Sequence, residues 1–143
     1  MEKEFVPYEQ ALALKELGFN EECLTSYHYN GTLIDMWSAV GFVTNSSLIN
    51  PEQFNANNNS KLLKDYIDNP FTAAPTFSQA FRWFREKYNL HGIVSYYGKN
   101  QWDIELLDYK GNQLVEIENN TFWTYEEAEL ACLNKLIEII KQK

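Results

Sequence analysis

Apolar residues recur at helical spacing in three segments of the chain, at about 7–17, 77–89 and 125–141. Side chains three and four positions apart lie on one face of a helix, so each segment predicts an amphipathic helix. The third segment has the widest apolar stripe, which comprises Ala128, Cys132, Leu133, Leu136, Ile137, Ile139 and Ile140. We therefore expect three helices, each burying one face against another element.

The ends of these helices carry recognisable signals. Thr76 is followed three residues later by Gln79, and Thr124 by Glu127, which is the pattern of a capping box. Gly18 follows the first helix, and a glycine there readily takes the left-handed conformation that ends a helix. These signals predict where the second and third helices begin and where the first one ends.

Two neighbouring segments, 23–30 and 32–37, alternate between apolar and polar residues as strands do. They flank the pair Asn30-Gly31, which favours a two-residue hairpin turn because both central positions need a positive φ. These segments therefore predict a first antiparallel hairpin.

Three further segments show strand-like patterns, at 93–97, 101–107 and 113–118. The turn signals Gly98-Lys99-Asn100 and Lys110-Gly111-Asn112 separate them. Strands joined by such short turns pair antiparallel, so we expect a three-stranded meander.

Together these elements predict one α+β domain over residues 1–143, in the order α–ββ–α–βββ–α. The antiparallel sheet is expected to pack against the second and third helices. Residues 41–75 interrupt the pattern, because they are polar, rich in Asn and low in complexity. A long irregular segment within a compact domain is either functional or an insertion, and we favour an insertion.

The composition limits the functional classes to which this chain can belong. Twelve Lys and Arg against 20 Asp and Glu give a net charge of −8 at pH 7. Domains that bind nucleic acid neutralise phosphates with basic residues, so the excess of acid argues against direct binding of nucleic acid. Aromatic residues make up 15% of the chain, which is typical of a folded domain rather than a disordered one. No apolar run reaches the roughly 18 residues of a membrane helix, so we expect no membrane association.

Neither the cysteines nor the histidines form a metal-binding pattern. Cys23 and Cys132 are far apart, and His28 and His91 lack ligand-type residues at the short spacing of metal motifs. We therefore expect no metal and no cofactor. Two isolated thiols, together with an opening sequence unlike a signal peptide, predict a cytoplasmic protein.

One trio of residues superficially resembles a catalytic triad. Ser26, His28 and Asp35 share a face of the first predicted hairpin, with Ser26 directly opposite Asp35. A triad needs the histidine between the other two residues and an oxyanion hole beside the serine. We interpret the trio as the polar half of an amphipathic hairpin and expect no catalytic residues.

A cluster of carboxylates is expected on the predicted meander. A two-residue turn at either Lys110-Gly111 or Gly111-Asn112 gives one face four acidic residues, Asp103, Glu105, Glu116 and Glu118. Opposed like charges cost on the order of a few tenths of a kcal/mol per pair. The face is either a surface for a basic partner or a cation, or a solvated face, which is commoner in an acidic protein.

The second helix has another candidate surface. Arg82 and Arg85 are the only arginines, and they flank Trp83 away from the apolar stripe. An exposed Trp beside Arg is the composition of interface hot spots. Trp83 is alternatively buried by the 41–75 segment or by a neighbouring helix, and the sequence leaves both alternatives open.

Three stretches, PYEQALALKELGF at 7–19, APTFSQAFRWFREKY at 74–88 and YEEAELACL at 125–133, form longer motifs. They resemble a set of small uncharacterised proteins of Bacteroides-type gut bacteria and of their phages and mobile elements. The resemblance implies an origin in a phage or mobile element, and it implies no activity.

The sequence therefore predicts a non-enzymatic accessory protein of a phage or mobile element. It is expected to bind a protein partner, such as a basic host factor that it inhibits, through the acidic face or the Arg82-Trp83-Arg85 patch. A homo-oligomeric structural protein is the first alternative. A small hydrolase that uses the carboxylates of the meander is the second.

Overall fold

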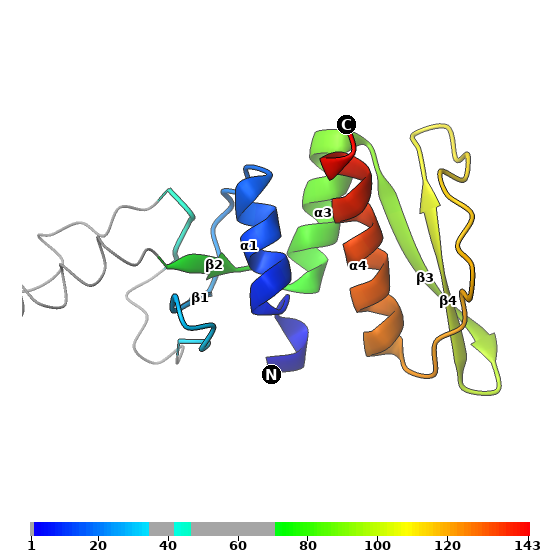
Figure 1. Cartoon of the computed structure of the whole chain (residues 1–143), viewed down its shortest axis with the longest axis horizontal. Coiled ribbons are helices and arrows are strands. Elements are labelled where there is room, and N and C mark those ends of the chain that lie inside the picture. The colour runs from blue at the N-terminus through cyan, green and yellow to red at the C-terminus, as the bar shows by residue number, and fades with distance from the viewer. Residues whose placement is uncertain (1, 35–41, 47–70) are drawn as a thin grey trace, which may run out of the picture. The chain divides into compact units, whose positions relative to one another are not determined.

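The structure is a computed structural model that describes residues 2–34, 42–46 and 71–143. It confirms the α+β class. The described residues belong to two compact units, unit 1 (Met1–Val6 and Thr76–Lys143) and unit 2 (Pro7–Pro75). The elements in chain order are η1 (Glu2–Glu4), α1 (Tyr8–Glu16), β1 (Thr25–Tyr27), β2 (Thr72–Ala74), α3 (Phe77–Tyr88), β3 (His91–Gly98), β4 (Gln101–Leu107) and α4 (Tyr125–Lys141) (Figure 1).

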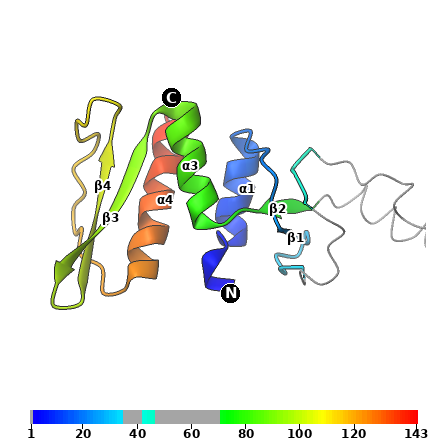
Figure 2. The same ribbon diagram turned by 180° about the vertical axis from the view of Figure 1, so that it is seen from behind.

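In unit 1, two helices cover one face of a hairpin. β3 and β4 pair antiparallel, from His91 opposite Leu107 to Tyr96 opposite Trp102. α4 packs against both strands, and α3 packs against α4 and β3, so both helices lie on the same side of the hairpin (Figures 1 and 2). The buried side chains between the layers include Phe84, Ile104, Leu106, Cys132, Leu133 and Leu136. The core of unit 1 therefore uses one face of the hairpin.

Both helices of unit 1 begin where the capping signals predicted. The Thr76 side chain accepts a hydrogen bond from the Gln79 N–H at 3.2 Å, and the Gln79 side chain accepts one from the Thr76 N–H at 3.0 Å. Thr124 likewise accepts from the Glu127 N–H at 3.1 Å. The Glu127 carboxylate reaches one residue further back than in a capping box and accepts from the Trp123 N–H at 3.3 Å.

In unit 2, α1 stops before Gly18, as expected. Gly18 has a φ of +94°, and its N–H donates to Lys15 O at 3.0 Å. The Phe19 N–H donates to Leu14 O at 2.9 Å. These are the two hydrogen bonds of a Schellman motif. Leu14 and Phe19 are both buried, so this helix end also brings two apolar side chains into the core of unit 2.

The short sheet of unit 2 has a strand that the sequence pattern missed. β1 pairs antiparallel with β2, from Thr25 opposite Ala74 to Tyr27 opposite Thr72, and α1 packs against β2. β2 lies inside the segment 41–75, so the prediction that this whole segment is irregular is wrong for residues 72–74. All three residues of each strand are buried.

An asparagine side chain connects this sheet to the end of α1. The Asn45 Nδ2 donates to Phe19 O at 2.8 Å, and the Asn45 Oδ1 accepts from the Ala73 N–H at 2.8 Å. Lys15 Nζ also donates to Phe71 O at 3.0 Å. These bonds fix β2 relative to α1 within unit 2.

The first hairpin turn is one residue longer than predicted. The His28 N–H donates to Thr32 O and the Gly31 N–H donates to His28 O, both at 2.9 Å, and Gly31 has a φ of +84°. This is a three-residue loop with glycine in the left-handed position. It moves the pairing by one residue, so Tyr27 bridges Leu33. Of the predicted strand 32–37, residues 32–34 are described and form only this bridge, and residues 35–37 lie outside the described residues.

The turn after β4 has the same length and the same backbone bonds. The Asp108 N–H donates to Asn112 O and the Gly111 N–H donates to Asp108 O, both at 3.0 Å, and Gly111 has a φ of +80°. The returning chain pairs with β4 only briefly, through a bridge between Leu107 and Gln113 and a bond from the Leu114 N–H to Leu106 O at 2.8 Å. The predicted third strand, 113–118, is therefore wrong beyond these two residues.

Candidate functional site

The hairpin of unit 1 has one covered face and one open face. Gly92 lies against helix side chains, because a Cβ there would come within 2.7 Å of the Cys132 sulfur and 2.9 Å of the Phe81 ring. Successive residues of a strand point to opposite faces, so the odd-numbered residues of β3 and β4 point away from the helices. We call the surface formed by His91, Ile93, Ser95, Asp103, Glu105 and Leu107 the open face.

Two of the predicted site residues lie on the open face. Asp103 is opposite Ser95, and Glu105 is opposite Ile93. Glu105 is exposed, whereas the Oδ1 atom of Asp103 is buried and has no hydrogen-bond partner among the described residues. A buried carboxylate oxygen without a donor is unfavourable and uncommon.

The other two predicted acidic residues do not join them on the sheet. Glu116 and Glu118 are exposed, and they lie in residues 115–119, which form no strand. The predicted face of four carboxylates is wrong because it required a two-residue turn. The loop Tyr109-Lys110-Gly111 has three residues and reverses the parity of every position after it.

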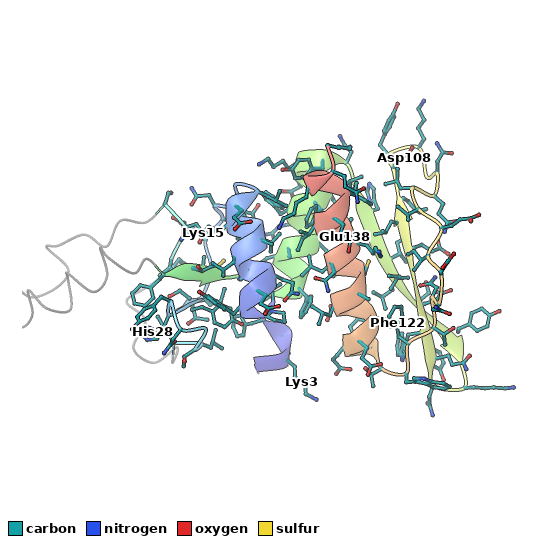
Figure 3. All side chains as sticks on the ribbon, in the orientation of Figure 1. Lys3, Lys15, His28, Asp108, Phe122 and Glu138 are labelled. Atoms are coloured by element: carbon teal, nitrogen blue, oxygen red, sulfur yellow. The ribbon has the colours of Figure 1, made fainter. Side chains whose placement is uncertain are left out.

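Asn120 completes the outer edge of β4 in place of a strand. Its Nδ2 donates to Ile104 O at 2.8 Å, and its Oδ1 accepts from the Ile104 N–H at 3.1 Å. The main chain takes over again at Phe122, which exchanges two 2.9 Å hydrogen bonds with Trp102. Asp108 and Phe122 mark the two ends of this outer segment (Figure 3). The segment therefore covers the edge of β4 and leaves its open face uncovered by any described helix of unit 1.

The helix patch does not have the exposed tryptophan that a hot spot requires. Trp83 is only 6% exposed, and its ring contacts the rings of Phe84 and Tyr88 at centroid distances of 5.1 and 5.3 Å. Lys87 Nζ lies 4.8 Å from the centroid of the Trp83 ring. Arg82 and Arg85 are exposed, so the patch consists of two arginines without an aromatic anchor.

The serine–histidine–aspartate trio is not assembled by the described residues. Ser26 is buried and lies opposite Ala73, so its predicted place on a solvated polar face is wrong. The His28 ring contacts the Phe71 ring at a centroid distance of 4.8 Å. The Ile34 N–H donates to Ser26 O at 2.9 Å, which removes the expected pairing of Ser26 with Asp35. Asp35 itself lies outside the described residues.

Sequence reasoning missed a cluster of rings at one end of the hairpin. Trp102 lies between Tyr96 and Tyr125, at centroid distances of 5.0 and 5.1 Å. The Tyr125 hydroxyl donates to Glu129 at 3.4 Å. Burial raises the pKa of Tyr125, and the neighbouring Glu129 raises it further. The only sequence signal is that aromatic residues flank the turn between β3 and β4.

Within the described ranges, no group of three or more His, Cys, Asp or Glu residues could hold a metal ion. Cys23 and Cys132 are both free and buried, and burial raises the pKa of each thiol to about 12. None of the described helices is both long enough and apolar enough to cross a membrane.

Comparison with protein-family models, with curated proteins and with solved structures finds no match to this chain.

Proposed function

We propose that this chain is a non-enzymatic accessory protein of a phage or mobile element that binds a basic protein through the open face of unit 1. The observation that carries the proposal is the pair of carboxylates, Asp103 and Glu105, on the sheet face that the helices leave uncovered. The phage or mobile-element origin is part of the proposal and rests on the motifs at 7–19, 74–88 and 125–133.

The chemistry of the open face favours a cationic partner. A Lys or Arg side chain of a partner offers a charged donor to the carboxylates of this face, and charge-assisted hydrogen bonds are roughly twice as strong as neutral ones. Ser95, which lies opposite Asp103, is small, so a long basic side chain can cross it. The net charge of −8 would also accelerate the approach of a basic protein.

The role that follows is inhibition of a host factor in the cytoplasm. A host protein that binds nucleic acid has a basic surface for phosphates. An acidic protein occupies such a surface by charge complementarity and thereby blocks it. In this proposal the chain binds the host protein and leaves the nucleic acid uncontacted.

The test compares two matched pairs of substitutions. Asp103→Asn with Glu105→Gln removes two charges from the open face, and Glu116→Gln with Glu118→Gln removes two charges from the segment beyond β4. Each tagged variant and the wild type are used to capture proteins from cytosol of the native host. The captured protein is identified by mass spectrometry and purified, and its Kd is measured by calorimetry at low and high salt.

We expect the open-face pair to weaken binding by at least about tenfold and to reduce its salt dependence, and the control pair to change the Kd much less. Equal losses in both pairs would mean that net charge alone is responsible. Unchanged binding in the open-face pair, with a normal circular dichroism spectrum, would refute the proposed surface.

A further inference from the structure

The main-chain hydrogen bonds of β4 show which groups of β3 lack partners. Trp102, Ile104 and Leu106 direct their main-chain groups outward, to Phe122, Asn120 and Leu114. In an antiparallel ladder, the residues opposite these three therefore direct their own main-chain groups to the other edge. Those residues are Tyr96, Val94 and Gly92. Within the described residues, β3 pairs only with β4, so three N–H and three C=O groups face an unoccupied edge.

The side chains of β3 also indicate an edge. Ile104 and Leu106 on β4 are 1% and 0% exposed, as expected beneath helices. None of the eight residues of β3 is buried, although Gly92 and Val94 point to the same covered face. Ile93, Tyr96 and Tyr97 are exposed apolar or aromatic residues. The helices of unit 1 therefore do not bury the side chains of β3, and β3 forms an open edge of the sheet.

Protein sheets usually protect such an edge. Common devices are a proline, a charged side chain or a bulge in the middle of the edge strand. The segment 91–98, HGIVSYYG, contains no Pro, Lys, Arg, Asp or Glu. Its single irregularity lies between Tyr96 and Gly98, at the far end of the strand. The other side of the hairpin is covered by Asn120 and its neighbours, so β3 is the unprotected side.

We propose that β3 pairs antiparallel with β3 of a second copy of this chain, which joins two hairpins into one continuous sheet. Val94 would lie opposite Val94 of the partner subunit, and Gly92 opposite Tyr96 of the partner subunit. This register places the outward main-chain groups of both copies face to face and ends before the irregularity at Gly98. The pairing is two-fold symmetric and uses both free edges, so it stops at a dimer.

The charge distribution identifies a second copy as the occupant. Two chains of net charge −8 repel, so they associate best through a surface that carries no carboxylates. β3 is such a surface, and the proposed register brings Ile93 and Ser95 opposite each other, with no charged pair. Asp103 and Glu105 lie one strand further from the symmetry axis, so the dimer leaves the open face free. The dimer therefore does not depend on the proposed binding of a basic protein.

The test is the oligomeric state of the full chain, measured by sedimentation velocity from about 1 to 200 µM. Val94→Pro removes one outward N–H without breaking the bonds to β4, and Val94→Lys places a charge on the edge. Val94→Thr is the matched control, because it keeps a β-branched residue and the N–H. We expect twice the 16.8 kDa chain mass for the wild type and Val94→Thr, and the mass of a single chain for the other two.

A wild type that sediments as a single chain throughout this range would overturn the proposal. A wild-type dimer that persists in both Val94→Pro and Val94→Lys would also overturn it, because the interface would then lie elsewhere. Val94→Lys keeps the test decisive if the proline variant does not fold.

The register has its own test. Facing residues in such a pair have Cα atoms about 5.5 Å apart, within the range that a disulfide spans. Val94→Cys should therefore form a covalent dimer on mild oxidation, and Glu105→Cys, one strand away, should not. Equal cross-linking of both variants would refute the register.

Discussion

The two three-residue turns of this protein are alike in their backbone and differ in the strands that they follow. His28–Thr32 and Asp108–Asn112 have the same pair of backbone hydrogen bonds and the same left-handed glycine. β1, before the first turn, is buried on both faces, because Thr25, Ser26 and Tyr27 are at most 7% exposed. β4, before the second, has a covered face and an open face. The turn geometry therefore does not decide whether a strand is structural or presents a surface.

The side chains that support the turns also differ. In the first turn, the Asn30 Oδ1 accepts a hydrogen bond from the Thr32 N–H at 3.0 Å. In the second, the Asp108 Oδ1 accepts from the Lys110 and Asn112 N–H groups at 2.8 and 2.9 Å. The first turn is held by a neutral amide and the second by a carboxylate, so only the second should respond to acid.

The largest difference between the two regions should come from placing the same charge in β1 and on the open face of the hairpin formed by β3 and β4. Ser26→Lys puts an ammonium group into the buried β1, and we expect a loss of about 3 kcal/mol or more of unfolding free energy. Ser95→Lys places the same group opposite Asp103 on the open face, and we expect a change within about 1 kcal/mol. Urea denaturation measures both. Similar losses in the two variants would mean that the open face is not solvated.

The two bridging asparagines provide a matched comparison with a smaller effect. Asn45→Ala in unit 2 and Asn120→Ala in unit 1 each leave a main-chain N–H and C=O without their partner. We expect each change to cost about 1–3 kcal/mol, because unsatisfied groups that are partly buried lose solvation as well as the bond. Thermal unfolding followed by circular dichroism measures the loss. If the midpoint of the Asn120 variant is unchanged, water replaces the side chain at that edge.

Loss of either helix cap should have a modest effect. The two caps differ in one bond, because Gln79 accepts from the N–H of the cap residue of α3, whereas Glu127 accepts from the residue before the cap of α4. Thr124→Ala and Thr76→Ala should each cost about 1 kcal/mol, because each removes the acceptor for an N–H of the first turn. Thr76→Ser and Thr124→Ser retain the hydroxyl and serve as controls. If the urea midpoint of Thr124→Ala equals that of the wild type, the hydrogen bond between Trp123 and Glu127 is sufficient to cap α4 without the Thr124 hydroxyl.

The smallest expected effect is a difference between the two turns in how their contribution to stability depends on pH. Hydrogen bonds from Asn112 lower the pKa of Asp108 below its usual value. A depressed pKa stabilises the fold above the unfolded pKa of about 4, and this contribution is lost as the pH falls through the lower folded value. Relative to Asp108→Asn, the wild type should therefore lose stability below about pH 4, whereas Asn30→Asp introduces a similar dependence into the first turn. If the urea midpoints of the wild type and of Asp108→Asn change by the same amount between pH 7 and 2.5, this prediction is wrong.

The helices could be predicted from the sequence because their signals are local. Thr76 with Gln79, Thr124, and Gly18 all act within a few residues, and the structure shows the bonds that they imply, except that Glu127 bonds the Trp123 N–H instead of the Thr124 N–H. β2 could not be predicted in this way. Its three residues, Thr72-Ala73-Ala74, have little apolar surface, and their partner strand lies more than forty positions earlier in the chain.

The candidate site was predictable only in part, because the sequence does not reveal the lengths of the turns. Glycine supplies the positive φ of a two-residue turn and of a three-residue turn equally well, so Gly31 and Gly111 do not reveal the loop length. Alternation within β4 correctly placed Asp103 and Glu105 together. Everything beyond the turn depended on loop length, so Glu116 and Glu118 were assigned to a face that they do not share. The replacement of a strand by the Asn120 side chain depends on tertiary structure, which no local pattern encodes.

Each compact unit happens to contain one buried thiol, Cys23 in unit 2 and Cys132 in unit 1. With a pKa of about 12, either thiol is almost entirely protonated at neutral pH, and alkylating reagents react with the thiolate. Modification therefore requires the surrounding unit to open first. The rate at which each cysteine is alkylated therefore reports the opening of its own unit. Both rates can be measured on the native chain without an engineered label.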